Sequence, residues 1–228
     1  MTTLTILGHS DWGYVYGNNA TWSTCRSTST AFHVTATAMT LGQTTGYYTW
    51  RNFLRFDTSA IPAGAVVSSL KLRLTVTTQH ASSDAVYLRI YKYDWSAYVP
   101  IAAGNREAVY DDVLGSVYDN SLASAQINNQ VVGTQALSEE LDITNLNLSG
   151  YTYYGLLGNR DVNDSYPPGG DNRWYVGTPS NATDSNKPAL VIEYTSGIAG
   201  VKTINGVADW KTINGVAKEV IASIQEIT

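Results

Sequence analysis

The sequence predicts an all-β protein, an antiparallel β-sandwich of jelly-roll type followed by a short C-terminal repeat tail. Two observations predict the sandwich: apolar residues alternate with polar ones along most segments, and Gly, Pro, Asn and Ser turns separate those segments. A third, a nine-residue phrase written twice after residue 200, predicts the tail. A chain of 228 residues with 43% hydrophobic content can bury one sizeable core. We therefore expect one β-sandwich domain over residues 1–195 and a tail over residues 196–228.

The clearest strand is "SSLKLRLTVTT", residues 68–78, in which Leu70, Leu72, Leu74 and Val76 share one face and polar residues occupy the other. A period of two is typical of a half-buried antiparallel strand. The same pattern predicts strands at residues 4–7, 12–16, 31–38, 51–57, 85–93, 141–143, 151–157, 173–176 and 189–195.

Helical periodicity is scarce in this chain. Residues 106–117 can form a turn or two of helix, with Val109, Val113 and Leu114 on one side, and residues 121–128 are similar. We expect both to be short excursions between strands and not a second domain.

Composition and charge exclude several classes of function. The 14 basic and 19 acidic residues give a formal charge of -5, and no Lys/Arg run offers a surface for DNA or RNA. Only 14% of residues are charged, while 16 Tyr and 6 Trp suit the exposed surface of an extracellular β protein. Cys25 is the single cysteine, which excludes an intramolecular disulfide and a metal cluster built on thiolates.

The N-terminal stretch "MTTLTILGHSDWGYVYG" has no basic region and no long apolar core, so it predicts no signal peptide. No stretch approaches the roughly 20 apolar residues of a membrane helix. An extracellular-looking chain without an export signal fits a protein released by lysis, as virion proteins are, and export by other machinery is the alternative. We expect it in a virion, without membrane contact.

One long phrase carries a family resemblance. "RNFLRFDTSAIPAGAVVSSLKLRLTV" (residues 51–76), together with "NKPALVIEYT" (residues 186–195), resembles the DNRLRE-type, disaggregatase-related β-sandwich modules. Those modules occur in bacterial and archaeal surface proteins and in phage particles, and they resemble carbohydrate-binding jelly rolls. The resemblance covers residues 9–195 and implies the fold rather than a function. Leu70 departs from it, since a small residue often begins the family's Leu strand.

The strand in this phrase also predicts an ion pair. Arg55 and Asp57 share the face opposite Leu54 and Phe56. We expect an Arg–carboxylate pair that bridges neighbouring strands, and its role is structural.

No arrangement of residues predicts catalysis. His9, His33 and His80 are far apart and lack metal-ligand spacing, and no nucleophile elbow or phosphate loop accompanies them. Two pairs of acidic residues are adjacent in the sequence: Asp111 with Asp112, and Glu139 with Glu140. Neighbours in an extended chain point to opposite faces, unlike the paired carboxylates of a glycosidase. We predict that the protein is not an enzyme.

A carbohydrate-binding module is the alternative function. Aromatic faces pack on the apolar face of a pyranose, while nearby Asn, Asp and Arg side chains bind its hydroxyl groups. The candidate residues for such an exposed platform are Trp12, Tyr14, Trp22, Tyr91, Tyr93, Trp95, Trp174 and Tyr175. In the strand at 85–93, period two places Leu88 and Ile90 inward and Tyr87, Tyr91 and Tyr93 outward. The competing interpretation is that aromatics fill the core and form cross-strand pairs.

Residues 159–175 form a polar segment with Asp161, Asp164 and Asp171, whose oxygens are the ligands that calcium prefers. Their spacing matches no defined calcium motif, so an ordinary surface loop is the other interpretation. The sequence predicts no further cofactor.

The tail repeats residues 202–208 as residues 211–217, and each copy contains an Asn-Gly pair, at 205–206 and 214–215. Asn-Gly is the strongest short-range signal for a two-residue hairpin turn. Isolated two-stranded ribbons are marginal in water, so the repeats need a partner surface. The last segment, from Ala217 to Ile224, suits either an amphipathic helix or a final strand.

We expect the tail to bind another chain, and a tail folded back on its own domain is the alternative. The candidate assembly residues are Val201, Ile204, Asn205, Gly206, Val207, Trp210, Ile213, Asn214, Gly215, Val216, Val220, Ile221 and Ile224. Similar repeats are familiar at the ends of phage structural and phage-encoded surface proteins. This resemblance implies a virion structural protein, used in capsid decoration, a head fibre or a tail appendage. Its partners would be other virion proteins or copies of itself.

Overall fold

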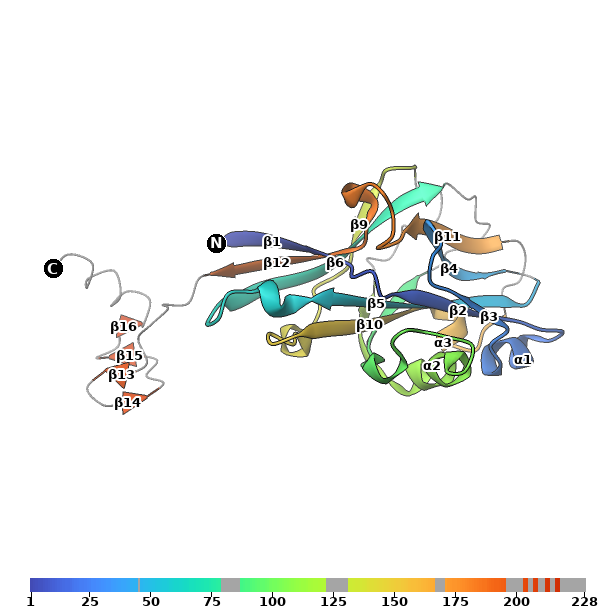
Figure 1. The fold of residues 1–228 in the computed structure, drawn as a ribbon, viewed down its shortest axis with the longest axis horizontal. Coiled ribbons are helices and arrows are strands. Elements are labelled where there is room, and N and C mark those ends of the chain that lie inside the picture. The colour runs from blue at the N-terminus through green and yellow to red at the C-terminus, as the bar shows by residue number, and fades with distance from the viewer. Residues whose placement is uncertain are drawn as a thin grey trace.

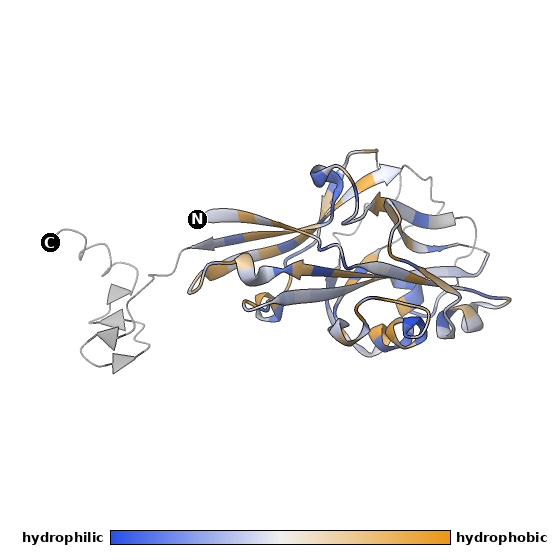
Figure 2. Ribbon diagram, in the orientation of Figure 1, coloured by the Kyte–Doolittle hydropathy of each residue, from blue (hydrophilic) through white to orange (hydrophobic). Residues whose placement is uncertain are grey.

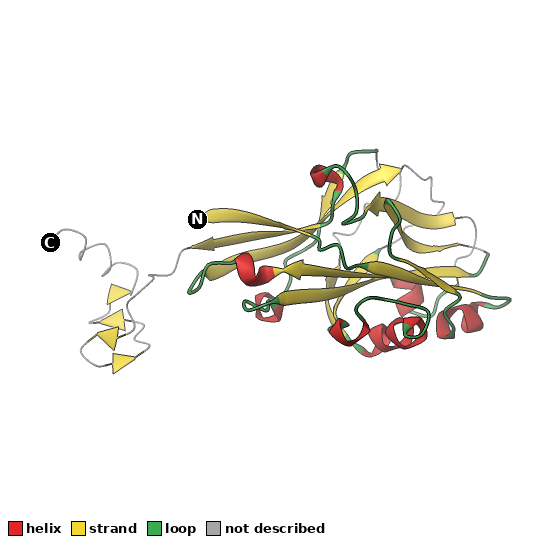
Figure 3. Ribbon diagram, viewed as in Figure 1, coloured by secondary structure: helices red, strands yellow, loops and turns green. Residues whose placement is uncertain are grey.

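A computed structural model gives the fold and describes residues 1–44, 46–78, 87–121, 131–166 and 171–195, together with four two-residue strands of the tail. Twelve strands form one curled sheet in which every pairing is antiparallel (Figures 1 and 3). The predicted all-β antiparallel class is confirmed. The jelly-roll connectivity stays a prediction.

The strands are β1 (Thr2–Leu7), β2 (Gly13–Asn18), β3 (Ala31–His33), β4 (Ala38–Thr44), β5 (Tyr48–Asp57), β6 (Val66–Thr78), β7 (Leu88–Lys92), β8 (Val117–Ser121), β9 (Gln135–Leu137), β10 (Tyr151–Gly158), β11 (Asp171–Gly177) and β12 (Ala189–Thr195). The helices are α1 (Trp22–Ser27), α2 (Arg106–Asp112) and α3 (Asn159–Val162). The short 3-10 turns are η1 (Thr58–Ala60), η2 (Ser96–Tyr98), η3 (Val113–Gly115), η4 (Ile143–Asn145) and η5 (Asp184–Asn186).

The sheet is sandwich-like because its two halves cover one another. The strand order is β1-β12-β6-β11-β4-β5-β10-β7-β8, with β2 and β3 joined at β5 and β9 joined at β6. Figure 1 shows β1, β12 and β6 lying across from β5 and β10. An isolated bridge between Gly8 and Phe56 links the two halves at one edge.

The main core lies between these halves and follows the predicted alternation. Leu70, Leu72 and Leu74 of β6 are fully buried and pack with Leu54 of β5 and Ile192 of β12. Hydrophobic and hydrophilic residues interleave along the strands in Figure 2, as a period of two requires. Burying each such side chain stabilises the fold by about 1.5–3 kcal/mol relative to leaving it in water.

A second core covers the opposite face of β5 and buries tyrosines that the sequence predicts to be exposed. The segment with η2, α2 and η3 packs Val109, Tyr110 and Val113 against Phe53 of β5. The helix predicted at residues 106–117 is confirmed as α2 and η3. Tyr91 and Tyr93, predicted to face solvent, do leave the main core but are buried in the second one.

Several predicted element boundaries are wrong. Residues 141–143 do not form a strand, because Asp142 accepts a hydrogen bond from the Thr144 N–H and starts η4. The strand predicted at 31–38 is divided between β3 and the beginning of β4. Helix α1 was not predicted, although Thr21 caps it by accepting from the Thr24 N–H. The helix predicted at 121–128 falls on the end of β8 and on residues outside the described ones.

The tail contains two hairpins, as the Asn-Gly pairs predict. Strand β13 (Thr203–Ile204) pairs with β14 (Val207–Ala208), and β15 (Thr212–Ile213) pairs with β16 (Val216–Ala217). Each pair is a two-stranded sheet of its own. Ile204 faces Val207 and Ile213 faces Val216 in register, so one Asn-Gly pair lies between the partners in each copy.

Candidate functional site

A buried ion pair fixes the end of the molecule that carries α1 and α3. Arg51 of β5 donates to both carboxylate oxygens of Asp161 in α3, from Nε at 2.7 Å and from Nη2 at 2.8 Å. Neither side chain is exposed to solvent. The Arg51 guanidinium also lies over the Tyr110 ring at 3.8 Å and donates to the Tyr110 carbonyl. Burial opposes charge on Arg51, but Asp161 more than offsets it and holds the pKa of Arg51 above its usual value.

Arg26 extends this pair to the surface. Its Nε donates to the Asp161 carbonyl at 2.8 Å and lies 3.3 Å from Asp161 Oδ1, and its Nη1 lies 2.9 Å from Asp164 Oδ1. Arg26 belongs to α1, whereas Asp161 and Asp164 follow β10. We call Arg26, Arg51, Asp161 and Asp164 the ion cluster. Its two cations and two anions balance, and it ties α1, β5 and α3 together.

Three aromatic side chains pack together and meet the ion cluster through Trp22. The Trp22 indole N–H donates to Asp164 Oδ1 at 3.2 Å, and the Trp22 ring lies 6.0 Å from that of Tyr166. The Tyr47 ring lies 5.1 Å from Tyr166 on its other side. Tyr166 is 42% exposed, and its two neighbours are half-buried. We call Trp22, Tyr47 and Tyr166 the aromatic cluster.

Two unusual backbone conformations occur at this place. Among the described residues, Tyr47 and Asp164 are the non-glycine residues with positive φ, at 56° and 52°. Such conformations are uncommon outside glycine and gather at binding sites and ligand clamps. Here they place one ring of the aromatic cluster and the carboxylate that holds another.

The predicted aromatic platform is largely wrong. Six of its eight residues are buried: Trp12, Tyr14, Tyr91, Tyr93, Trp95 and Trp174. The sheet curls until Trp12, Tyr14 and Trp174 join the main core, and the segment with η2 and α2 covers the other three. Tyr175 is half-buried, and Trp22 belongs to the aromatic cluster.

Two of the three predicted calcium ligands, Asp161 and Asp164, form ion pairs with arginines. Asp161 is fully buried against Arg51 and Arg26, so it is not an oxygen ligand at a surface loop. Asp164 pairs with Arg26, and the Asp171 side chain lies outside the described residues. Within the described ranges, no group of three or more His, Cys, Asp or Glu side chains could hold a metal ion.

The remaining polar residues singled out in the sequence have structural partners. Arg55 pairs with Asp11 and not with Asp57, and it also contacts His9. Asp57 instead accepts from the Ser59 N–H and starts η1. His33 stacks on Tyr16, whereas His80 lies outside the described residues.

One carboxylate of each adjacent pair has a structural partner. Glu140 pairs with Lys71, and Asp112 accepts from the Tyr98 hydroxyl. Asp111 and Glu139 are exposed. The extended geometry predicted for Asp111 and Asp112 is wrong, because both belong to helix α2.

A second feature lies at the other end of the sandwich, where β12 finishes. An apolar pocket of about 390 Å³ is lined by Ala65, Val66, Val67, Ile143, Thr144, Leu146 and Leu148. Val66, Ile143 and Leu148 are 58%, 43% and 48% exposed, which is unusual for such side chains. Val66 pairs with Thr195, the last residue of β12, so the chain leaves the sheet at the edge of this apolar pocket.

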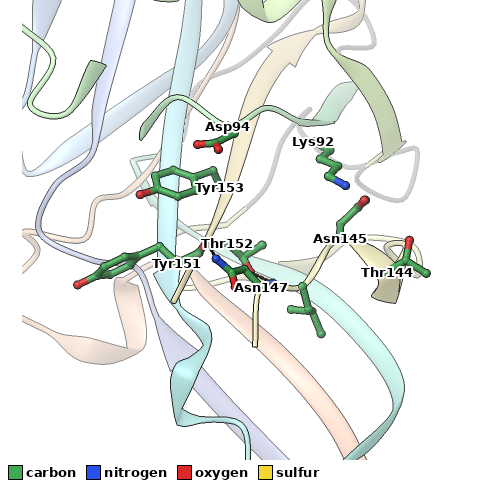
Figure 4. Close-up of a pocket in the computed structure, with 9 residues that line it drawn as sticks. Lys92, Asp94, Thr144, Asn145, Asn147, Tyr151, Thr152 and Tyr153 are labelled. Carbon is green, nitrogen blue, oxygen red and sulfur yellow. Dashed lines mark hydrogen bonds between the residues drawn. The ribbon is translucent and has the colours of Figure 1, made fainter. Parts of the chain in front are cut away.

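A polar pocket of about 340 Å³ adjoins the apolar one and shares Thr144 and Leu146 with it. Figure 4 shows Lys92 and Asn145 on one side of this polar pocket and Tyr151 and Tyr153 on the other. Asn145 is held by Asp119, which accepts from its Nδ2 at 2.6 Å. Hydrogen bonds from Thr144 lower the pKa of Asp142, which supports the ionised form that caps η4.

The predicted assembly residues have no described side chains. The backbones of Ile204, Val207, Ile213 and Val216 are placed in the two hairpins. The other assembly residues lie outside the described residues: Val201, Asn205, Gly206, Trp210, Asn214, Gly215, Val220, Ile221 and Ile224.

Sequence reasoning missed most of the site near α1. Arg51 begins the strand predicted at residues 51–57, but the ion pair predicted in that strand involves Arg55 and not Arg51. Tyr47 follows Gly46, and Tyr166 precedes two prolines, both turn signals that place an aromatic near the surface. Nothing in a single sequence brings these segments together.

No protein-family model matches the chain, and no curated protein is significantly similar to it. The resemblances to DNRLRE-type modules and to phage tail repeats therefore stay predictions. Among the described residues, no helix is long and apolar enough to cross a membrane.

Proposed function

We propose that the chain is a structural protein of a phage particle, a surface-displayed β-sandwich held in place through its C-terminal repeats. Capsid decoration, a head fibre and a tail appendage are the forms such a protein takes. Its partners are other virion proteins or further copies of the chain.

The duplicated hairpins are the observation that carries this proposal. Each is a separate ribbon of two-residue strands, and a ribbon of that size has too little buried surface to be stable alone in water. Because the hairpin is repeated, the chain presents two copies of the same surface to a partner. Because strands recruit further strands through their free edges, the hairpins suit addition to a neighbouring sheet.

The end of the sandwich next to the tail also supports assembly. Exposed Val66, Ile143 and Leu148 surround the apolar pocket, and the polar pocket with Lys92 and Asn145 lies beside it. An apolar centre with a polar rim is typical of protein interfaces. An interface of about 1,000 Å² or more suffices for specific association, and apolar burial contributes about 25 cal/mol per Å².

Deletion of residues 197–228 tests the proposal. Every strand from β1 to β12 is retained, so the truncated chain is expected to fold and to lose assembly. Sedimentation velocity compares its oligomeric state with that of the full chain, and co-purification tests retention on the particle. Normal assembly of the truncated chain would contradict the proposal.

Substitutions in the full chain provide a matched control. Ile204→Asp with Ile213→Asp places charge on the apolar pair of each hairpin, and Thr203→Asp with Thr212→Asp places it one residue away in the same strands. Successive residues in a strand point to opposite faces. The isoleucine variant is therefore expected to dissociate while the threonine variant assembles.

Carbohydrate binding is the second candidate function. The buried positions of six predicted platform residues weigh against the platform as predicted. The aromatic cluster at the α1 end is the observation that favours this function, and it involves a different set of residues.

A further inference from the structure

We propose that the aromatic cluster of Trp22, Tyr47 and Tyr166 is a binding site for a neutral oligosaccharide. This role is separate from tail-mediated assembly and needs no part of the tail.

The three rings form a continuous and partly exposed aromatic surface. Consecutive centroids lie 6.0 and 5.1 Å apart, within the range of directly packed aromatic pairs. The rings are inclined by 62° and 36°, so they form an uneven surface and not a closed stack. Aromatic side chains with a polar end commonly bind ligands that are apolar on one face and wet on the other.

Polar groups for hydroxyl binding stand beside the rings. The Asp164 side chain is 65% exposed, and its Oδ1 lies near Arg26 and accepts from the Trp22 indole N–H. Asn163 comes from the same short segment, whereas the Arg160 Nη1 already donates to the Tyr166 carbonyl. A sugar hydroxyl that donates to Asp164 makes a charge-assisted hydrogen bond, one of the stronger kinds in proteins.

The charge of the site selects a neutral ligand. Arg26 and Arg51 are matched by Asp161 and Asp164, so the ion cluster carries no net charge. The ion cluster itself therefore offers an acidic saccharide no unpaired cation. Residues Asp161 and Arg51 act as positioning residues, since they hold the elements that carry the rings and touch no ligand themselves.

The position of the site in the molecule suits a displayed protein. Strand β5 runs from Tyr48, next to Tyr47, to Asp57, near the end where β12 finishes (Figure 1). Ten residues of strand cover about 30 Å at about 3.3 Å per residue. The aromatic cluster and the apolar pocket therefore lie at opposite ends, and attachment at one leaves the other open.

Titration of the full chain with cellohexaose, chitohexaose and hexagalacturonate tests this site. The Trp22 indole resonance in ¹H–¹⁵N spectra, assigned from its absence in Trp22→Ala, is expected to shift saturably with a neutral hexasaccharide. Trp22→Ala and Tyr166→Ala are each expected to weaken binding at least tenfold by calorimetry. Tyr194→Ala, a half-buried tyrosine on β12, is the control and is expected to bind as the unaltered chain does.

Two results would overturn the proposal. One is the absence of saturable binding by either neutral probe, and the other is binding that Trp22→Ala and Tyr166→Ala leave unchanged. Binding of hexagalacturonate alone is a case of the first result, and it would reveal a cationic site. Near-ultraviolet circular dichroism establishes that each variant is folded, and assembly is measured separately, so failure of one proposal does not decide the other.

Discussion

Arg51 and Asp161 lie 110 positions apart in the sequence, and their ion pair decides how two distant segments meet. Both side chains are buried away from water. A buried charge is costly unless it is paired and hydrogen-bonded. The Asp161 carboxylate pairs with both Arg51 and Arg26, and the Arg51 guanidinium lies against the Tyr110 ring. This pair helps to fix the two segments that carry Trp22 and Asp164, and it therefore helps to position both residues.

Asp161→Asn is expected to destabilise the protein by about 3–5 kcal/mol, because it leaves the buried Arg51 charge without its counter-charge. Urea unfolding followed by circular dichroism measures the change in the free energy of unfolding. Asp164→Asn is the matched control, since it removes an exposed carboxylate from the same cluster and is expected to cost at most about 1 kcal/mol. Equal effects of the two substitutions would contradict this assignment.

Cys25 is expected to be unreactive in the native protein. It is fully buried, its Sγ donates to the Gly17 carbonyl at 3.3 Å, and burial together with nearby Asp161 raises its pKa to about 12. Ellman's reagent at pH 8 is expected to label it only after unfolding, since the thiolate is the reactive form. Rapid labelling of the folded chain would contradict both its burial and its raised pKa.

The same pKa shift gives a sign for the pH dependence of stability. Between the ordinary thiol value of 9.0 and about 12, the unfolded chain loses a proton that the folded chain keeps. Ionisation therefore favours unfolding, and the contribution of Cys25 to stability falls as pH rises through this window. Below pH 9 both states hold the proton and the contribution is constant.

At the scale of elements, strands and helices are held together by close backbone approaches. A Cβ added at Gly17 of β2 would lie 2.0 Å from the Cys25 carbonyl oxygen of α1 and 2.8 Å from the Tyr110 hydroxyl. The Tyr110 hydroxyl itself donates to that carbonyl at 2.7 Å. Helix α1 can therefore lie on β2 only if residue 17 has no side chain.

Gly17→Ala is expected to push α1 away from β2 and to destabilise the protein by about 1–3 kcal/mol, the usual cost of overpacking. Thermal unfolding followed by circular dichroism checks it. Gly115→Ala is the control, because a Cβ there meets nothing within 4 Å, and it is expected to leave the melting temperature unchanged. A neutral Gly17→Ala would show that α1 is not packed as described.

At the scale of the whole molecule, the two ends differ in chemistry. The end where β12 finishes exposes apolar side chains around the apolar pocket, and the α1 end exposes aromatic rings next to a balanced ion cluster. An apolar end that adjoins the tail suits attachment, and an aromatic end at the far side suits recognition of a ligand.

The truncated chain that tests assembly also tests the independence of the sandwich. Both cores are formed by residues between Ile6 and Ile192, so removal of residues 197–228 is expected to leave its melting temperature close to that of the dissociated full chain. Differential scanning calorimetry at low protein concentration makes the comparison. A large loss of stability would show that the tail packs on its own domain, which is the alternative to assembly.

Alternation of apolar and polar residues predicted side-chain burial correctly in strands that have one covered face. It predicted the burial of Leu70, Leu72 and Leu74, and the strand at 189–195 coincides with β12. It failed at β5 and β7, because the segment with α2 covers the face that alternation assigns to solvent. Polar and aromatic residues there, such as Arg51 and Tyr93, are buried by partners far away in the sequence.

The sequence by itself determined the β class, the leucine strand, the strand that ends at Thr195 and the two tail hairpins. These depend on local rules, namely the period of a strand and the turn preference of Asn-Gly. Only the tertiary structure decided which aromatics are buried, which carboxylates pair with arginines, and that Trp22, Tyr47 and Tyr166 meet. Those outcomes depend on how the sheet curls and on which loops cover it, and contacts between distant segments leave no periodic trace along the chain.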